Sequence, residues 1–316
     1  MASPMHARRA KLKSQLVSAK AKLKHHVTPR RLLLLSAAAA SAFLLLLTLR
    51  TLSAAAANTS SPAPVVVHRS QQQQRDDQCD RVPAGVAEAL VHYATSNATA
   101  WGRGRRRSAE EVAATARAVS RRAPCNLLVF GLGHGAALWA ALNHGGRTVF
   151  LEEDDALVSG ASPASLAIEA YRVAYLASAA DADELLALRD SEHCTGAAAT
   201  QLSPGHFDRS PCKLAVRGLP AAFYEAEWDV IVVDAHAPPP PTTTAMMGAI
   251  YTAAVAARAR RPAAETETDV VVHDVDKPVQ DRFSTAFLCG GYLKEGVGNL
   301  RRFAIPSHKE GMPFCP

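Results

Sequence analysis

The chain has 316 residues, a formal net charge of +6 and 20% charged residues. Much of the basic excess lies in residues 1–31 and in the cluster Arg103 to Arg107, so it reflects two local features rather than a basic surface. Local clusters of this kind do not indicate a nucleic-acid-binding protein, and we expect no nucleic acid among the partners.

A basic, then apolar, N-terminal segment predicts a membrane anchor. Residues 1–31 hold nine Lys or Arg and no acidic residue, and Leu32 to Leu49 follow as an uncharged run of eighteen residues. A helix of this length crosses roughly 30 Å of hydrocarbon. A cleaved signal peptide would have a shorter apolar part nearer the start, so we expect an uncleaved anchor. Because basic flanks stay cytosolic, the rest of the chain is predicted to be lumenal, in a type II topology.

Two further regions follow the predicted transmembrane helix. Residues 50–80 are rich in Ala, Ser, Pro and Gln and contain few large apolar residues, which predicts a flexible lumenal stem. Residues 81–316 are long enough for one lumenal domain and show no internal repeat. Asn58 and Asn97 each begin an Asn-x-Ser/Thr triplet, so a glycoprotein is expected, although such triplets also occur by chance.

The first part of the predicted domain contains two helical patterns, Ala84 to Tyr93 and Ala109 to Arg121. Between them, Gly102 to Arg107 is read as a solvated basic loop, with contact to an acidic polysaccharide as the open alternative. A third, short helical pattern covers Asp183 to Asp190.

The most informative stretch reads as strand, glycine loop, helix, strand and acid. Asn126 to Phe130 is a short apolar run, and three glycines follow it where the backbone must turn tightly and approach a ligand closely: Gly131, Gly133 and Gly135. Ala136 to Asn143 has helical spacing. Thr148 to Leu151 is a second apolar run that ends at Glu152 or Glu153, where such folds bind a ribose hydroxyl. The pattern predicts a nucleotide-like cofactor.

The glycine pattern does not by itself identify the cofactor. Gly131-x-Gly133-x-x-Ala136 satisfies the dinucleotide fingerprint, and the same loop followed by an acid also suits S-adenosylmethionine. A glycine turn in an α/β core without any ligand is the third alternative.

Two more apolar runs in the second half also end in polar residues. Val230 to Val233 precedes Asp234, and Val270 to Val272 precedes His273 and Asp274. Continuous apolar runs are typical of parallel strands covered on both faces, and Ala245 to Arg260 between them has helical character. We therefore predict a Rossmann-like α/β sheet with helices on both faces. Ligands bind beyond the carboxyl ends of such strands, so these residues and the glycine loop are expected to share one cleft.

Each of these strand-end residues also has a structural alternative. Asp234 can cap a turn, His273 can be an interior histidine with satisfied hydrogen bonds, and Asp274 can be a loop acid. Together the three have ligand types that suit a metal ion but no diagnostic spacing, and we predict no metal site.

The cysteine count is even, which suits an oxidising lumenal compartment. Six cysteines permit three disulfides in any of 15 connectivities, and among them we expect Cys194 to pair with Cys212. No CxxC pair is present, so a structural zinc site is not expected.

Five motifs in residues 82–316 resemble a plant polysaccharide-biosynthesis family that contains glucuronoxylan 4-O-methyltransferases and irregular xylem fifteen-like proteins. The motifs read ALVHYATSN, CNLLVFGLGH, LNHGGRTVFLEED, EWDVIVVDA and VVHDVDKPV. The tail motifs FLCGGYL and FAIPSHKEGMPFCP look more similar to the irregular xylem fifteen branch.

The resemblance implies a Golgi membrane protein of xylan assembly in the secondary cell wall, with an S-adenosylmethionine-methyltransferase-type fold. The implied partners are the Golgi membrane, xylan or glucuronoxylan, and other xylan-synthesis proteins. One branch of the family methylates the 4-hydroxyl of glucuronic acid on xylan, whereas the other is required for normal xylan without an assigned reaction.

The chain departs from the family pattern in two places. Gly135 and Ala136 replace an acid or polar pair after His134, and a proline run at 238–241 follows Asp234 in place of Pro-Thr-Gly-Tyr. Met246 stands where the family has an arginine that can pair with a uronate carboxylate. The second departure is expected to alter the acceptor side of the cleft.

Two hypotheses of different classes follow. The first is a protein required for xylan biosynthesis whose reaction is unassigned, including an accessory role without chemistry. The alternative is a glucuronoxylan 4-O-methyltransferase: Gly131, Gly133, Gly135 and Glu152 would hold S-adenosylmethionine, and Asp234 or His273, with Asp274 nearby, would remove the hydroxyl proton. An NAD-dependent enzyme is less favoured, because no Tyr-x-x-x-Lys pair is present.

Overall fold

The computed structural model describes residues 81–96, 107–133, 135–161, 168–177, 179–196, 201–235, 244–261, 267–308 and 312–315. The chain divides into two units, Met1–Arg69 and Ser70–Pro316, and every described residue belongs to the second. The predicted cytosolic tail, transmembrane helix and stem therefore lie outside the described residues, as do Asn58 and Asn97. Within the described residues, no helix has both the length and the apolar character that a membrane crossing requires.

Seven strands form one mixed sheet in the order β3-β2-β1-β4-β5-β7-β6. Their bounds are β1 Asn126–Phe130, β2 Arg147–Glu152, β3 Glu169–Arg172, β4 Val230–Val233, β5 Glu267–Val272, β6 Leu293–Val297 and β7 Leu300–Pro306. The first five are mutually parallel, with Val129 opposite both Phe150 and Val232. β7 runs antiparallel to β5 and to β6. The predicted parallel strands are confirmed, and the C-terminal hairpin that makes the sheet mixed was not expected.

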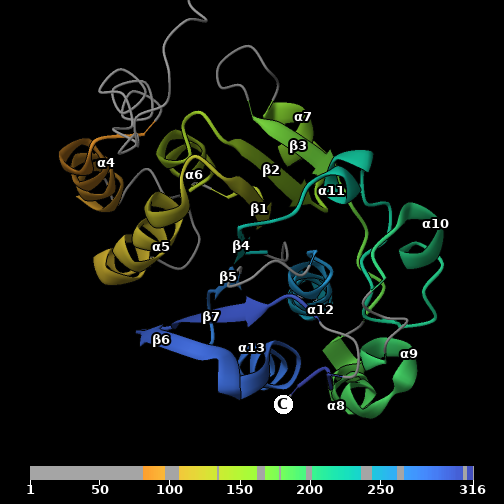
Figure 1. Ribbon diagram of the computed structural model, residues 1–316. Coiled ribbons are helices and arrows are strands. Elements are labelled where there is room, and N and C mark those ends of the chain that lie inside the picture. The colour runs from red at the N-terminus through yellow and green to blue at the C-terminus, as the bar shows by residue number, and fades with distance from the viewer. Residues whose placement is uncertain are drawn as a thin grey trace, which may run out of the picture. The chain divides into compact units, whose positions relative to one another are not determined.

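Helices cover both faces of the sheet, as predicted: α5 and α6 lie on one side, and α12 and α13 on the other (Figure 1). The α-helices are α4 Ala84–Ser96, α5 Ala109–Arg122, α6 Ala136–Leu142, α7 Asp155–Gly160, α8 Ala182–Ala187, α9 Glu192–Thr195, α10 Pro204–Phe207, α11 Ala221–Glu225, α12 Thr244–Arg258 and α13 Pro278–Phe283. Short 3-10 turns flank α8, and a π-helical segment, Ser284–Cys289, continues α13. The helix predicted at Asp183 to Asp190 is this α8 region.

Side chains along the central strands point alternately to the two faces of the sheet, so the core is divided between these faces. Leu128 and Phe130 on β1 join the buried cluster that includes α12, whereas Leu127 and Val129 join the cluster that includes α5 and α6. Successive side chains of a strand point to opposite faces, so a strand that is apolar at every position must be covered on both. The continuous apolar runs in the sequence therefore determined that this sheet lies inside the domain.

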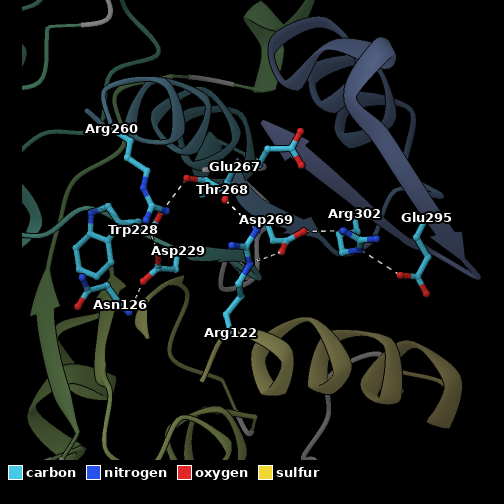
Figure 2. Close-up of polar contacts among 10 residues, drawn as sticks. All are labelled: Arg122, Asn126, Trp228, Asp229, Arg260, Glu267, Thr268, Asp269, Glu295 and Arg302. Carbon is cyan, nitrogen blue, oxygen red and sulfur yellow. Dashed lines mark hydrogen bonds and ion pairs between the residues drawn. The ribbon is translucent and has the colours of Figure 1, made fainter. Parts of the chain in front are cut away.

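A polar network joins α5, β5 and the C-terminal hairpin (Figure 2). Asp269 of β5 is 4% exposed, and its two carboxylate oxygens accept hydrogen bonds from Arg122 Nε at 3.2 Å and from Arg302 Nη1 at 2.6 Å. Arg122 also donates to the Glu267 carbonyl, and Arg302 Nε donates to Glu295. Because the acid is buried between two guanidinium groups, the network fixes the hairpin against the parallel part of the sheet.

Two disulfides hold segments of the described chain. Cys194 pairs with Cys212, as predicted, and Cys289 pairs with Cys315. Cys125 carries a free thiol in the core, and burial, aided by the charge of Asp229, raises its pKa to about 12. This thiol is therefore protonated and unreactive at neutral pH.

The Cys289–Cys315 disulfide is expected to contribute about 3 kcal/mol to stability, because it closes a loop whose ends are 26 residues apart. The double variant Cys289→Ser with Cys315→Ser should lower the free energy of unfolding by about that amount in urea denaturation. Equal midpoints for the variant and the parent protein would contradict this expectation.

Candidate functional site

The glycine loop packs against the carboxyl end of β4. Gly131 N donates to the Leu151 carbonyl of β2 at 2.8 Å, and Asp234 N donates to the Phe130 carbonyl of β1 at 2.8 Å. Gly131 has φ of +105°, and a Cβ there would lie 2.4 Å from the Asp234 carbonyl oxygen. Only glycine fits this position, so the sequence motif is explained by backbone contact between two strand ends.

The other two loop glycines have different surroundings. Among the described residues, a Cβ at Gly133 would meet only the Asp234 carboxylate, with Oδ2 at 3.9 Å, so the described part of the chain leaves this side of the loop open. A Cβ at Gly135 would lie 2.8 Å from the indole Nε1 of Trp139. Gly133 is thus the glycine whose missing side chain leaves space, and Gly135 makes room for a buried tryptophan.

Glu152 at the end of β2 holds the loop itself. Its side chain is 6% exposed, Oε2 accepts from Leu132 N at 2.7 Å, and Oε1 accepts from the backbone N of Glu153 at 2.8 Å and of Asp154 at 3.0 Å. These bonds place the carboxylate at the loop but also occupy both of its oxygens. The ribose contact expected of Glu152 stays a prediction, and a ribose hydroxyl would have to share the carboxylate with these backbone donors.

The three predicted catalytic residues end two adjacent strands. Asp234, which is 3% exposed, follows β4 beside the glycine loop, and His273 N donates to the Val233 carbonyl from the end of β5. The His273 ring lies 3.1 Å from the Thr115 hydroxyl of α5, measured at Nε2. Asp274 has φ of 59° and accepts from Lys277 Nζ at 2.9 Å. The structure therefore brings Asp234 to the glycine loop and the His273 ring to α5.

Arg107 is a site residue that the sequence reading missed. The expectation that residues up to Arg107 form a solvated loop is wrong for this side chain, which is 8% exposed and forms an ion pair with Asp234. Burial lowers the pKa of Arg107 to about 10, and the charges of Asp274 and Glu111 oppose that shift. The guanidinium is therefore still protonated at neutral pH. Residues 101–106 of the basic cluster lie outside the described residues.

Two further polar groups near the strand ends have no hydrogen-bond partner in the described part of the chain. They are the indole Nε1 of Trp139, beside Gly135, and the hydroxyl of Tyr175. Burial raises the pKa of Tyr175, and the charges of Glu152 and Glu153 add to the rise. Buried donors that lack partners are uncommon in folded proteins. The Trp139 indole adjoins the glycine loop, whereas the Tyr175 ring packs beside Gly248 of α12.

The segment that follows Asp234 was expected to form the acceptor side of the cleft. Its residues 236–243 lie outside the described residues. Met246 is described, and its side chain is 6% exposed in the core cluster on the α12 side of the sheet. Among the described residues, no three His, Cys, Asp or Glu side chains gather in a group suited to a metal ion. An apolar groove of about 760 Å³ between α4 and α5 contains none of the predicted site residues.

Comparison with known proteins identifies the family. A family model described as IRX15/IRX15L/GXM matches residues 110–303. This chain belongs to the IRX15/IRX15L/GXM family. The match confirms the resemblance seen in the sequence motifs.

Relatives from Arabidopsis thaliana cover most of the chain. "Glucuronoxylan 4-O-methyltransferase 2" is 44% identical over 76% of this chain and 78% of its own length. "Arabinogalactan O-methyltransferase 2" is 37% identical over 72% and 77%, and "Protein IRX15-LIKE" is 32% identical over 74% and 72%. The tail motifs had suggested the irregular xylem fifteen branch, whereas identity over the whole match is higher with the glucuronoxylan methyltransferases.

Two solved structures are similar at low identity. A methyltransferase-like protein from Silicibacter pomeroyi has a TM-score of 0.32 and 16% identity over 72% of this chain and 88% of that one. Cofactor-bound Rv0187 from MTB has a TM-score of 0.37 and 14% identity over 79% and 100%. Both scores are low, and the fold is defined by the strand order and registers of the sheet.

Proposed function

We propose that this chain is an S-adenosylmethionine-dependent O-methyltransferase that acts on glucuronoxylan during xylan biosynthesis. The observation that supports this most directly is the contact between the glycine loop and Asp234, which places an open loop surface beside a buried carboxylate. The 44% identity with a glucuronoxylan 4-O-methyltransferase supports the substrate class.

The residues around the glycine loop fit a nucleoside cofactor. Gly133 leaves space in front of Asp234, and the Trp139 Nε1 beside Gly135, which has no partner among the described residues, offers a donor to a polar ligand. Gly131 and Gly133 would admit the cofactor, and Glu152 or Glu153 would take its ribose. When bound, S-adenosylmethionine supplies a methyl group on a positively charged sulfur.

The protein's own contribution to the reaction is alignment and proton removal. Asp234 ends β4 next to the loop, and its carboxylate would take the proton that the acceptor hydroxyl loses as the new oxygen–carbon bond forms. A 3% exposed carboxylate is shielded from water, which favours proton transfer from a positioned hydroxyl over exchange with solvent. Asp274 on the next strand end lies on the side where the acceptor would enter. We assign His273 a positioning role, because its ring contacts Thr115 of α5.

The proposed cellular setting is the Golgi membrane, with the domain in the lumen. The Cys194–Cys212 and Cys289–Cys315 disulfides support an oxidising compartment. The apolar run Leu32 to Leu49 supports a single N-terminal anchor.

The substitution Gly133→Val tests cofactor binding with little effect on the fold. The added side chain would enter the open side of the loop, so we expect the affinity for S-adenosylmethionine to fall by at least about 100-fold. Calorimetric titration of the purified full-length chain measures this affinity. Gly131 is unsuitable for the test, because its substitution would displace the end of β4.

Gly291→Val is the matched control, since among the described residues a Cβ at Gly291 meets nothing within 4 Å, and Gly291 lies on an exposed turn after the π-helical segment. The control should bind S-adenosylmethionine like the parent protein, and both variants should keep the parent melting temperature. A folded parent protein that binds no S-adenosylmethionine would refute the transferase proposal and favour the accessory role.

A further inference from the structure

Arg107 is held rigidly at the edge of the candidate site. It directly precedes Ser108, whose hydroxyl caps α5 by accepting from Glu111 N at 3.1 Å, while Ser108 N donates to the Glu111 carboxylate at 3.0 Å. The other oxygen of Glu111 accepts from Asn299 N at 2.6 Å, in the turn between β6 and β7. The backbone that carries Arg107 is therefore fixed to both α5 and the hairpin.

The Arg107 guanidinium has a hydrogen-bond donor that no acceptor among the described residues satisfies. It forms an ion pair with Asp234 through Nη2, whereas Nε donates no hydrogen bond within the part of the chain that the structure describes. Nε and Nη2 lie on one edge of the planar group, and this edge can bind a carboxylate through two parallel hydrogen bonds. A protonated side chain that is 8% exposed, and whose Nε has no acceptor among the described residues, is costly unless a ligand supplies one.

The position of Arg107 separates it from the predicted cofactor residues. The strand order places the ends of β2 and β1, with Glu152 and the glycine loop, on one side of Asp234. The end of β5, with Asp274, lies on the other side, and the charge of Asp274 acts on Arg107. The segment that carries Arg107 is tied through Glu111 to the β6–β7 turn, which lies beyond β5 in the strand order and therefore on the Asp274 side of Asp234.

We propose that Arg107 is the residue that recognises the carboxylate of an anionic sugar acceptor, a role that rests on the proposed methyl transfer. An acceptor carboxylate would bind the edge formed by Nε and Nη2 of Arg107 and would replace Asp234 as the partner of Nη2.

The experiment compares two acceptors that differ in one group. The first is a xylan oligosaccharide with a glucuronic acid branch, and the second is the same oligosaccharide with the carboxylate reduced to an alcohol. Calorimetry measures the binding of each, and of S-adenosylmethionine, to the full-length protein and to Arg107→Gln, Arg107→Lys and Arg117→Gln. Arg117 is the matched control, because it lies on α5 with 57% exposure and pairs with Glu295.

Arg107→Gln should weaken binding of the acidic oligosaccharide by about 10- to 100-fold, with little change for the reduced oligosaccharide or for S-adenosylmethionine. Arg107→Lys should show an intermediate loss, because an ammonium keeps the charge but not the paired donors. Arg117→Gln should bind all three ligands like the parent protein. If Arg107→Gln proves unfolded by circular dichroism, the Arg107→Lys comparison decides the question.

Three results would overturn the inference. Equal losses for both oligosaccharides would make Arg107 a structural partner of Asp234, and a selective loss for S-adenosylmethionine would assign its guanidinium to the carboxylate of the cofactor. Unchanged binding by both Arg107 variants would exclude any recognition role. Methyl transfer by the parent protein distinguishes the failure of the Arg107 role from the failure of the proposed function. If the parent protein transfers methyl groups, any of these three results refutes only the role of Arg107. A folded parent protein that neither binds the cofactor nor transfers a methyl group refutes the proposed function.

Discussion

Replacing Asp234 by Asn is expected to lower the rate of methyl transfer by about 10²- to 10⁴-fold, the usual contribution of a positioned general base. Asn keeps the size of the side chain and its place beside the glycine loop but cannot take a proton. The backbone contacts of Asp234 with Phe130 and Gly131 do not involve the side chain, so they should persist. We therefore expect binding of S-adenosylmethionine within a few-fold of that of the parent protein.

The measurement is kcat with saturating glucuronoxylan oligosaccharide, together with cofactor affinity and melting temperature. Asp190→Asn serves as the control, because it makes the same chemical change at a side chain that is 82% exposed. Retention of full kcat by folded Asp234→Asn would exclude the base role. A loss of cofactor affinity as large as the loss of rate would instead make Asp234 a binding residue.

Replacing Asp269 by Asn is expected to lower the free energy of unfolding by about 3 to 5 kcal/mol. The substitution removes the negative charge between Arg122 and Arg302, and both guanidinium groups are then left near a neutral amide. Asp269 is 4% exposed, so solvent cannot replace the lost interaction. The hairpin of β6 and β7 is tied to β5 by this residue, and it should loosen first.

Urea denaturation followed by circular dichroism measures this change, and hydrogen exchange of the β7 amides locates it. Asp183→Asn is the matched control, because it breaks a pair with Arg282 in which the aspartate is 85% exposed. Exposed pairs contribute little, so the control should stay within about 0.5 kcal/mol of the parent protein. An equal, small loss in both variants would show that the network does not hold the hairpin.

The sequence alone was sufficient to predict the strands and helices that form the centre of the domain. β1 and β4 begin and end at the predicted residues, and the helices after the glycine loop and between β4 and β5 lie within two residues of their predicted bounds. These segments are continuous apolar runs or helical patterns bounded by glycine and acid, which are local signals. The hairpin of β6 and β7 was missed because its half-exposed strands carry polar residues between the apolar ones.

The sequence also identified the loop and the acids at the strand ends, since the order of residues alone shows which glycines and acids directly follow an apolar run. Only the tertiary structure decided what each of them contacts. It placed Glu152 on the backbone of the loop, the His273 ring on α5, and Arg107 against Asp234, which is far from it in the sequence. Arginine in a basic cluster reads as solvated because charged side chains are rarely buried without a partner. The partner of Arg107 comes from another strand, so its burial follows from long-range packing that no local pattern encodes.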